Sequence, residues 1–144
     1  MEITAILKEA GLKVTRQRES ILDIFLHTDA RLTAEDVFLR LRERGEDFGL
    51  STVYRTLSAL AEHHVLERGE LPDSASQCYC MAHPGHRHQL TCVRCKRIIL
   101  LEECPAEEFL ESIGRKHGFQ VTGHSFEVFG VCPDCQKKSG GAPC

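Results

Sequence analysis

Residues 92–95 read Cys-Val-Arg-Cys, and the same Cys-x-x-Cys spacing returns at residues 132–135 as Cys-Pro-Asp-Cys. A turn of this kind brings two thiolates to one side, and two such turns supply the four sulfur ligands of a tetrahedral zinc site with Zn–S distances of ~2.3 Å. A redox Cys-x-x-Cys motif or buried thiols account for one such pair more readily than for two. We therefore predict a structural Zn²⁺ ion held by Cys92, Cys95, Cys132 and Cys135.

The chain around these turns changes character near residue 76. Residues 1–77 contain no cysteine, whereas seven histidines and cysteines are crowded into residues 78–95. The turn-forming residues Leu71–Ser76 separate the two parts. We predict a first domain at residues 1–82 with a hinge that starts near residue 78, a second domain at 83–137, and a disordered tail at 138–144.

The first part predicts four helices followed by a hairpin. Apolar residues recur at helical spacing within residues 3–10, after Thr15, after Thr33, and after Ser51 or Thr52, and each of these hydroxyl residues can cap the helix that follows it. The stretches 65–70 and 77–81 can pair as two short strands. Helices followed by a small antiparallel hairpin are typical of a winged helix-turn-helix domain.

The second part mixes strands with a helix. Short apolar stretches at 89–92 and 98–101 predict two strands, and the alternation of apolar and polar residues over 119–129 predicts a long one. Pro105 suits the first position of a helix that ends at Gly118. The predicted fold class is therefore α+β, with an N-terminal winged helix-turn-helix domain and a C-terminal α/β unit that contains the four-cysteine zinc site.

A second set of metal ligands lies outside the four cysteines. His86 and His88 are two residues apart, so both imidazoles project to one side of an extended segment. His124 lies within the predicted strand at 119–129, and two acidic residues open the predicted helix. A single histidine is more often structural, but this combination favours a second metal site made by His86, His88, His124 and Glu107, with Glu108 as the alternative carboxylate.

Composition limits the function classes. The 144 residues are 42% hydrophobic and carry a net charge of −3, and residues 1–76 hold 10 basic against 14 acidic side chains, so DNA binding would need a local basic patch. No apolar run approaches the ~20 residues that cross a bilayer, and the first residues do not resemble a signal peptide, so we expect a cytoplasmic protein without a membrane partner. The chain has no HExxH or H-x-E motif, serine elbow or phosphate-binding glycine loop, so we expect neither an enzyme nor a small-molecule substrate.

Several motifs in a fixed order resemble the ferric uptake regulator (Fur) family across about residues 5–137. They are GLKVTRQR at 11–18, TAEDVF at 33–38, STVYRTL at 51–57, HRHQLTCVRC at 86–95, and HGF with the following histidine and GVCPDC at 117–135. The resemblance implies a homodimer whose C-terminal domain is the dimerisation domain. It also implies a metal-responsive repressor of metal-uptake genes that binds double-stranded DNA at a palindromic operator.

The family pattern, carried onto matching positions, implies a recognition helix at Ser51–His63. Tyr54 and Arg55 would contact bases in the major groove, and both lie off the apolar stripe of that helix. Thr52 would contact phosphate, Lys13 would reach the minor groove from the loop before the second helix, and Arg16 would contact the DNA backbone. The full set of implied DNA-binding residues is Lys13, Arg16, Thr52, Tyr54 and Arg55.

The chain departs from iron-type members of the family at the metal sensor. Arg31 and Gln89 stand where those members have histidines, and Leu100 stands where they have a glutamate. The histidines of the peroxide-sensing branch are likewise replaced, by Arg87 and Gln89. The resemblance therefore does not carry the iron sensor or the peroxide sensor onto this chain.

Zinc-sensing members of the family instead use a hinge cysteine with an acidic residue. Carried onto this chain, that pattern implies a sensor made by Glu67, Cys80 (or Cys78) and His83, or a shared His86. Because a soft thiolate favours zinc, we expect a regulatory Zn²⁺ over Fe²⁺, with Mn²⁺ less favoured. A degenerate sensor would leave regulation to the site around His88.

Two other functions stay open from the sequence. The first is a zinc-stabilised dimeric protein-interaction module, whose winged helix binds another protein and shows no DNA affinity with any metal. The second is a thiol or peroxide redox sensor, in which oxidation of Cys92 and Cys95 expels the zinc.

Overall fold

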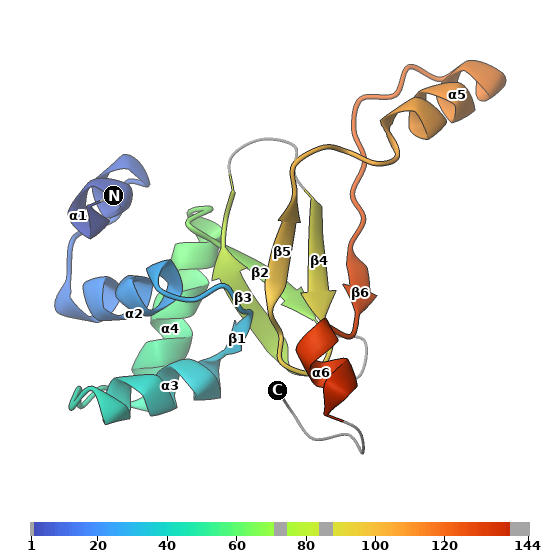
Figure 1. The fold of residues 1–144 in the computed structure, drawn as a ribbon. Helices are drawn as coiled ribbons and strands as arrows, with labels where there is room; N and C mark the ends of the chain where they lie inside the picture. Colours follow the sequence, from blue (N-terminus) through green and yellow to red (C-terminus); the bar gives the residue numbers. More distant parts are fainter. Residues whose placement is uncertain (1, 71–74, 84–87, 139–144) are drawn as a thin grey trace.

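The computed structural model describes residues 2–70, 75–83 and 88–138 of the chain. Two parts lie side by side: an N-terminal half with four helices and a small sheet, and a C-terminal half with a second sheet and two helices (Figure 1). The α+β class expected from the sequence is confirmed. Of the expected disordered tail, only Lys138 lies within the described residues.

The helices of the N-terminal half begin close to the residues that cap them. They are α1 (Ile3–Glu9), α2 (Arg16–Leu26), α3 (Ala34–Glu43) and α4 (Leu50–Glu62). Thr15 accepts a hydrogen bond from the Arg18 amide at the start of α2, and Thr33 forms a capping box with Asp36 at the start of α3. Helix α4 begins at Leu50, earlier than expected, because Gly49 serves as its N-cap and accepts the first helical hydrogen bond.

The core of the N-terminal half lies between these helices and the small sheet. Its fully buried members come from all four helices and the sheet, and include Leu7, Ile21, Leu22, Phe25, Val37, Leu41, Val53, Leu57, Leu60 and Tyr79. Burial of the Val53, Leu57 and Leu60 face of α4 leaves the opposite face of that helix toward solvent. No helix in the described part of the chain is long and apolar enough to span a bilayer.

The first sheet contains the expected hairpin and one strand more. Strands β2 (Leu66–Glu70) and β3 (Gln77–Met81) pair antiparallel, which places Glu67 opposite Cys80 and Gly69 opposite Cys78. Strand β1 (Leu32–Thr33) pairs with the other edge of β3, so the order is β1-β3-β2. A two-residue strand is too short to show an alternating pattern in the sequence.

The second sheet has the order β5-β4-β6. Strands β4 (His88–Cys92) and β5 (Ile98–Leu101) are antiparallel, and β6 (Val128–Gly130) runs parallel to β4. Helix α5 (Glu107–His117) projects away from both sheets, and α6 (Pro133–Lys137) lies beside the end of β4 (Figure 1). Gly118 ends α5 with a φ of 71°, as expected for its position.

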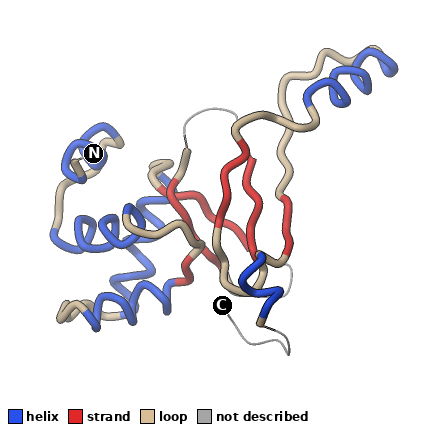
Figure 2. Tube along the Cα trace, in the orientation of Figure 1, coloured by secondary structure: helices blue, strands red, loops and turns tan. Residues whose placement is uncertain are grey.

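Two expectations about the C-terminal half are wrong. The long strand predicted at 119–129 is reduced to β6, and the chain from Phe119 to Glu127 runs as a loop (Figure 2). A strand needs a neighbour to pair with, and within the described residues only the last part of this segment lies beside β4. Helix α5 begins at Glu107, not Pro105, because the chain still turns at residues 105 and 106.

The two halves meet along a short backbone junction. The Ile98 amide donates to Asp29 O at 2.6 Å and the Arg31 amide donates to Lys96 O at 2.9 Å, so the chain just before β1 lies beside the start of β5. Ala30 and Arg97 form an isolated antiparallel bridge at the same place. The turn that carries Cys92 and Cys95 is therefore attached to the N-terminal half by backbone hydrogen bonds.

Candidate metal centres and nucleic-acid interface

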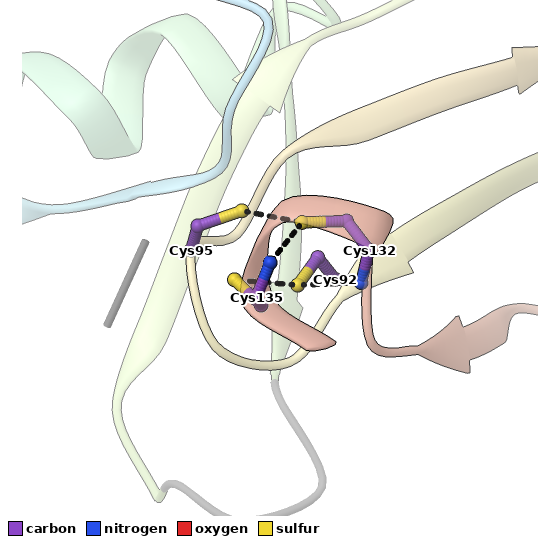
Figure 3. Close-up of side chains that lie close together, drawn as sticks. All are labelled: Cys92, Cys95, Cys132 and Cys135. Carbon is purple, nitrogen blue, oxygen red and sulfur yellow. Dashed lines mark hydrogen bonds between the residues drawn. The ribbon is translucent and has the colours of Figure 1, made fainter. Parts of the chain in front are cut away.

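The four predicted cysteines lie together at one end of the second sheet (Figure 3). Cys92 ends β4, Cys95 lies in the turn before β5, and Cys132 and Cys135 come from the start of α6. Their sulfurs lie within 4.8 Å of one another, with Cys92–Cys135 and Cys95–Cys132 distances of 3.7 Å each. A tetrahedral zinc site with ~2.3 Å bonds has sulfur–sulfur edges of ~3.8 Å, so this arrangement fits the ion.

Backbone amides around the four-cysteine cluster favour a thiolate. The Cys132 amide donates to the Cys92 sulfur at 3.3 Å, and the Cys135 amide donates to the Cys132 sulfur at 3.5 Å. Burial alone would raise the pKa of the Cys92 thiol, but the amides of Cys132, Cys95 and Arg94 lower that pKa to about 6. Burial, with the neighbouring sulfurs, raises the pKa of the Cys95 thiol. A bound cation is what would allow the thiols of Cys92, Cys95 and Cys132 to lose their protons together.

A second cluster lies at the other end of β4. His88 Nε2 is 3.0 Å from His124 Nε2, which is in turn 3.2 Å from the Cys104 sulfur. The donor atoms of these three residues lie within 4.8 Å of one another, and the Phe126 ring stacks on the His88 imidazole. Two imidazoles and a thiolate suit zinc and other borderline-soft metals.

This second cluster differs from the site expected from the sequence. Glu107, at the start of α5, is exposed and is not a member of the cluster, and His86 lies outside the described residues. Cys104 was not predicted to be a ligand, because it belongs to no motif and follows β5 at no diagnostic spacing. The only sequence signal was that it is a further cysteine in the C-terminal half.

Arg31 lies beside the residues that were expected to form the metal sensor. Glu67 and Cys80 are direct cross-strand partners, and His83 lines the same small cavity of ≈ 120 Å³ as Glu67. Gln89 hydrogen-bonds to Glu67 and to Cys80: its Nε2 is 3.4 Å from Glu67 Oε2 and 3.7 Å from the Cys80 sulfur. Arg31 donates to Gln89 Oε1 at 2.9 Å, so a guanidinium stands beside the expected ligands.

The electrostatics at this position oppose a second cation. Burial alone would lower the pKa of the Arg31 guanidinium, but the hydrogen bond and charge of Glu127 raise it, so Arg31 keeps its charge. Burial raises the pKa of the Cys80 thiol, which favours the neutral form over the thiolate that binds metal. The sensor expected at Glu67, Cys80 and His83 therefore does not fit a divalent ion, because a buried positive charge already lies there.

The implied DNA-binding residues are exposed or partly exposed on the N-terminal half. Thr52 and Arg55 lie on the solvent side of α4, with Arg55 Nη2 3.5 Å from Thr52 Oγ1. Tyr54 donates to Glu35 at 2.6 Å, a bond that lowers the pKa of the Glu35 carboxyl and raises that of the Tyr54 hydroxyl. Thr52 and Arg55 line a shallow depression of ≈ 210 Å³.

The start of α2 borders the same depression. Arg18 lines it, and its Nη1 donates to the carbonyl of the exposed Lys13 at 2.7 Å, which ties the loop before α2 to this face. Arg16 is 76% exposed and pairs with Glu46 at 3.0 Å. Arg18 was not singled out from the sequence, because only the packing of α2 against α4 brings it beside Arg55.

Comparisons with known proteins agree with this architecture. The sequence model of the ferric uptake regulator family matches residues 9–129. A ferric uptake regulation protein of Campylobacter upsaliensis is 35% identical over 136 residues, which cover 93% of this chain and 86% of the relative. Among solved structures, the Vibrio cholerae ferric uptake regulator superposes with a TM-score of 0.70 at 29% identity, covering 91% of this chain and 100% of the other. The Francisella tularensis regulator with iron gives 0.72 at 28%, covering 88% and 96%.

Proposed function

Because the chain belongs to the ferric uptake regulator family of transcription regulators, which are not enzymes, we propose that it is a homodimeric, metal-responsive repressor of metal-uptake genes. The observation that carries this proposal is the family match over residues 9–129 together with the four-cysteine cluster, whose 3.7 Å sulfur separations suit a zinc ion. The N-terminal half would serve as the winged helix-turn-helix domain, and the C-terminal half as the dimerisation domain.

The DNA contact would be made by α4 and the loop before α2. The Vibrio cholerae relative is described as having DNA-binding domains, and the exposed face of α4 offers the residue types that read DNA. Arg55 can donate two hydrogen bonds to a guanine in the major groove, and Tyr54 lies one residue before it. Lys13, Arg16 and Thr52 would contact the backbone and minor groove of a palindromic operator.

The homodimer would form on the apolar surface of the C-terminal half. Helix α5 and the loop after it expose large apolar side chains, with Phe109 67% and Phe119 75% exposed. Further exposed apolar residues on the same half are Ile99, Ile113, Val121 and Val128. Apolar surface of this extent marks an interaction site, and a second copy of the chain would also supply a strand partner for the alternating segment 119–127.

Two metal sites belong to the proposal. The four cysteines would hold a structural Zn²⁺, which clips α6 to the turn between β4 and β5. The regulatory ion would lie at His88 and His124, with Cys104 where Glu107 was expected and with His86 from outside the described residues. The sensor expected at Glu67, Cys80 and His83 is left out, because Arg31 lies beside those residues.

Zinc is the metal we favour for regulation, ahead of iron and manganese. The relatives named above are iron regulators, and one was solved with iron, so the preference rests only on the donor set of this chain. The Cys104 sulfur makes the second cluster softer than a histidine–carboxylate site, which favours Zn²⁺ over Fe²⁺ and Mn²⁺.

One experiment tests the whole proposal. The protein is purified without oxygen, its metals per chain are counted, and zinc, iron and manganese are each titrated against palindromic DNA. We expect one tightly held zinc per chain and an affinity for DNA that rises with added zinc and falls with added salt. No DNA binding with any metal would favour the protein-interaction module, and zinc release on mild oxidation with loss of DNA binding would favour the redox sensor.

A further inference from the structure

Arg31 lies at the junction between the two halves and is 3% exposed. Its Nη2 donates to Glu127 Oε1 at 2.6 Å and to Gln89 Oε1 at 2.9 Å, so one guanidinium links the segment before β1 to two residues of the C-terminal half. These partners are 58 and 96 positions away along the chain. A charge buried this deeply needs charged or polar partners, and Glu127 and Gln89 supply them at Nη2, whereas the buried Nε has no hydrogen-bond partner among the described residues.

The surrounding side chains are those that would otherwise bind a cation. Glu67, Gln89 and Glu127 line the same small cavity as Arg31, together with His83. Cys80 also belongs to this group of side chains, since its sulfur is 3.7 Å from Gln89 Nε2. Their carboxylate, imidazole and thiol groups are of the types that bind divalent metals, but with Arg31 in place no three of these residues bring their ligand atoms within 4.8 Å of one another.

The first sheet is shaped to accept the guanidinium. Gly69 of β2 lies directly against Arg31, and a Cβ atom at position 69 would overlap the Nη1 atom. Gly69 is opposite Cys78 in the register, and neither strand presents a bulky side chain at that point. A residue without a side chain at position 69 is therefore required for Arg31 to lie where it does.

We propose that Arg31 is a resident cation, which fills the position between the two halves where a regulatory metal would otherwise bind and holds the halves together without one. Arginine keeps its charge throughout the physiological range and accepts no metal, so this contact cannot respond to metal concentration. Metal response is then confined to the cluster of His88, Cys104 and His124. Only the statement that the metal response is confined to this cluster rests on the proposed metal-responsive function.

The test is a count of bound metal. Purified wild-type protein and its variants are saturated with zinc, dialysed and analysed for zinc per chain. We expect Arg31→Ala to bind one zinc more than the wild type, and the further change Cys80→Ser to remove that ion. Arg31→Lys should bind no extra zinc because it keeps a cation, and Arg44→Ala, which removes an exposed arginine–aspartate pair, is the matched control.

Two outcomes would overturn the proposal. One is a folded Arg31→Ala protein, judged by its circular dichroism, with the same zinc count as the wild type. The other needs no change at Arg31: Cys80→Ser in the wild-type background should leave the zinc count unchanged, and loss of one zinc would mean that a metal already binds there. Because zinc counting requires no operator, this test stands even if the chain binds no DNA.

Discussion

The Lys96 ammonium lies 3.0 Å from Asp36 Oδ2, the same carboxylate oxygen that accepts a hydrogen bond from the Thr33 amide in the capping box of α3. Lys96 directly follows Cys95 and has a φ of 66°, a left-handed conformation that is uncommon for a residue with a side chain. Its amide donates to Cys92 O, and its carbonyl accepts from the Arg31 amide. The turn that would hold zinc is therefore in direct contact with the start of α3.

Replacing Lys96 by Met should destabilise the contact between the halves. We expect a loss of about 1 kcal/mol or less in the free energy of unfolding, because the ion pair is partly exposed. Burial alone would raise the pKa of the Asp36 carboxyl, but the Thr33 amide and Lys96 lower it. The contribution is thus complete above the pKa of an unfolded aspartate, about 3.9, and is lost as pH falls through the lower folded value.

Urea denaturation at pH 7 and at acidic pH measures this effect. Lys8→Met, which changes an exposed lysine of α1, is the control and should leave stability unchanged. A Lys96→Met protein whose stability difference from the wild type is the same at every pH would show that the ion pair contributes nothing.

Removing the four-cysteine cluster should unfold the C-terminal half. We expect the double variant Cys95→Ser, Cys135→Ser to lose one zinc per chain, because a structural zinc contributes on the order of 10 kcal/mol to folding. Metal analysis and size-exclusion chromatography measure the two consequences, zinc loss and loss of the dimer. Cys78→Ser is the control, since that sulfur donates to Gly69 O and lies outside the cluster. An intact dimer without zinc would contradict a structural role.

The second cluster predicts different effects for two neighbouring candidates. Cys104→Ser should weaken the second metal by more than the ~10–100-fold that loss of an outer-sphere hydrogen bond causes, because a direct ligand is removed. Glu107→Gln should leave the affinity unchanged, since Glu107 lies outside the cluster. Competition with a coloured zinc chelator measures both. If Glu107→Gln weakened metal binding and Cys104→Ser did not, the ligand would be the Glu107 carboxylate expected from the sequence and not the Cys104 thiolate.

Arg55→Ala should reduce operator affinity by ~1–3 kcal/mol and leave the fold intact. The side chain is exposed, and within the described residues its one side-chain hydrogen bond is to Thr52, so its loss disturbs no buried contact. Fluorescence anisotropy with palindromic DNA at fixed salt measures the change. Arg42→Ala removes an arginine of α3 that is 59% exposed and should bind DNA as the wild type does. If Arg55→Ala and Arg42→Ala lowered the DNA affinity equally, α4 would not be the recognition helix.

Phe109→Glu should convert the dimer into a monomer. The change places a charge in the apolar surface formed by α5 and the loop after it, where burial against a second chain would then require desolvation of a carboxylate. Light scattering across a range of protein concentrations measures the molar mass. Leu39→Glu alters an apolar residue of α3 that is 59% exposed and should remain dimeric. A dimeric Phe109→Glu protein would place the interface elsewhere.

Features that depend on residues close together in the chain could be predicted from the sequence. Thr15 and Thr33 were identified as helix caps and Gly118 as the end of α5, because each acts on backbone groups within a few residues of itself. The two Cys-x-x-Cys turns could likewise be found by their spacing, since each pair converges within one turn. These features are properties of short segments, so the sequence contains nearly all the information that defines them.

Long-range features required the folded chain. Whether 119–127 forms a strand depends on a neighbour to pair with, which alternation alone does not supply. Cys104 joins His124, and Arg31 joins Glu127, only because packing brings together residues 20 and 96 positions apart. A cysteine without a motif looks ordinary in the sequence, and the resemblance marks Arg31 only as a departure from the iron-type pattern. Their roles follow from burial and from the partners that tertiary structure places around them.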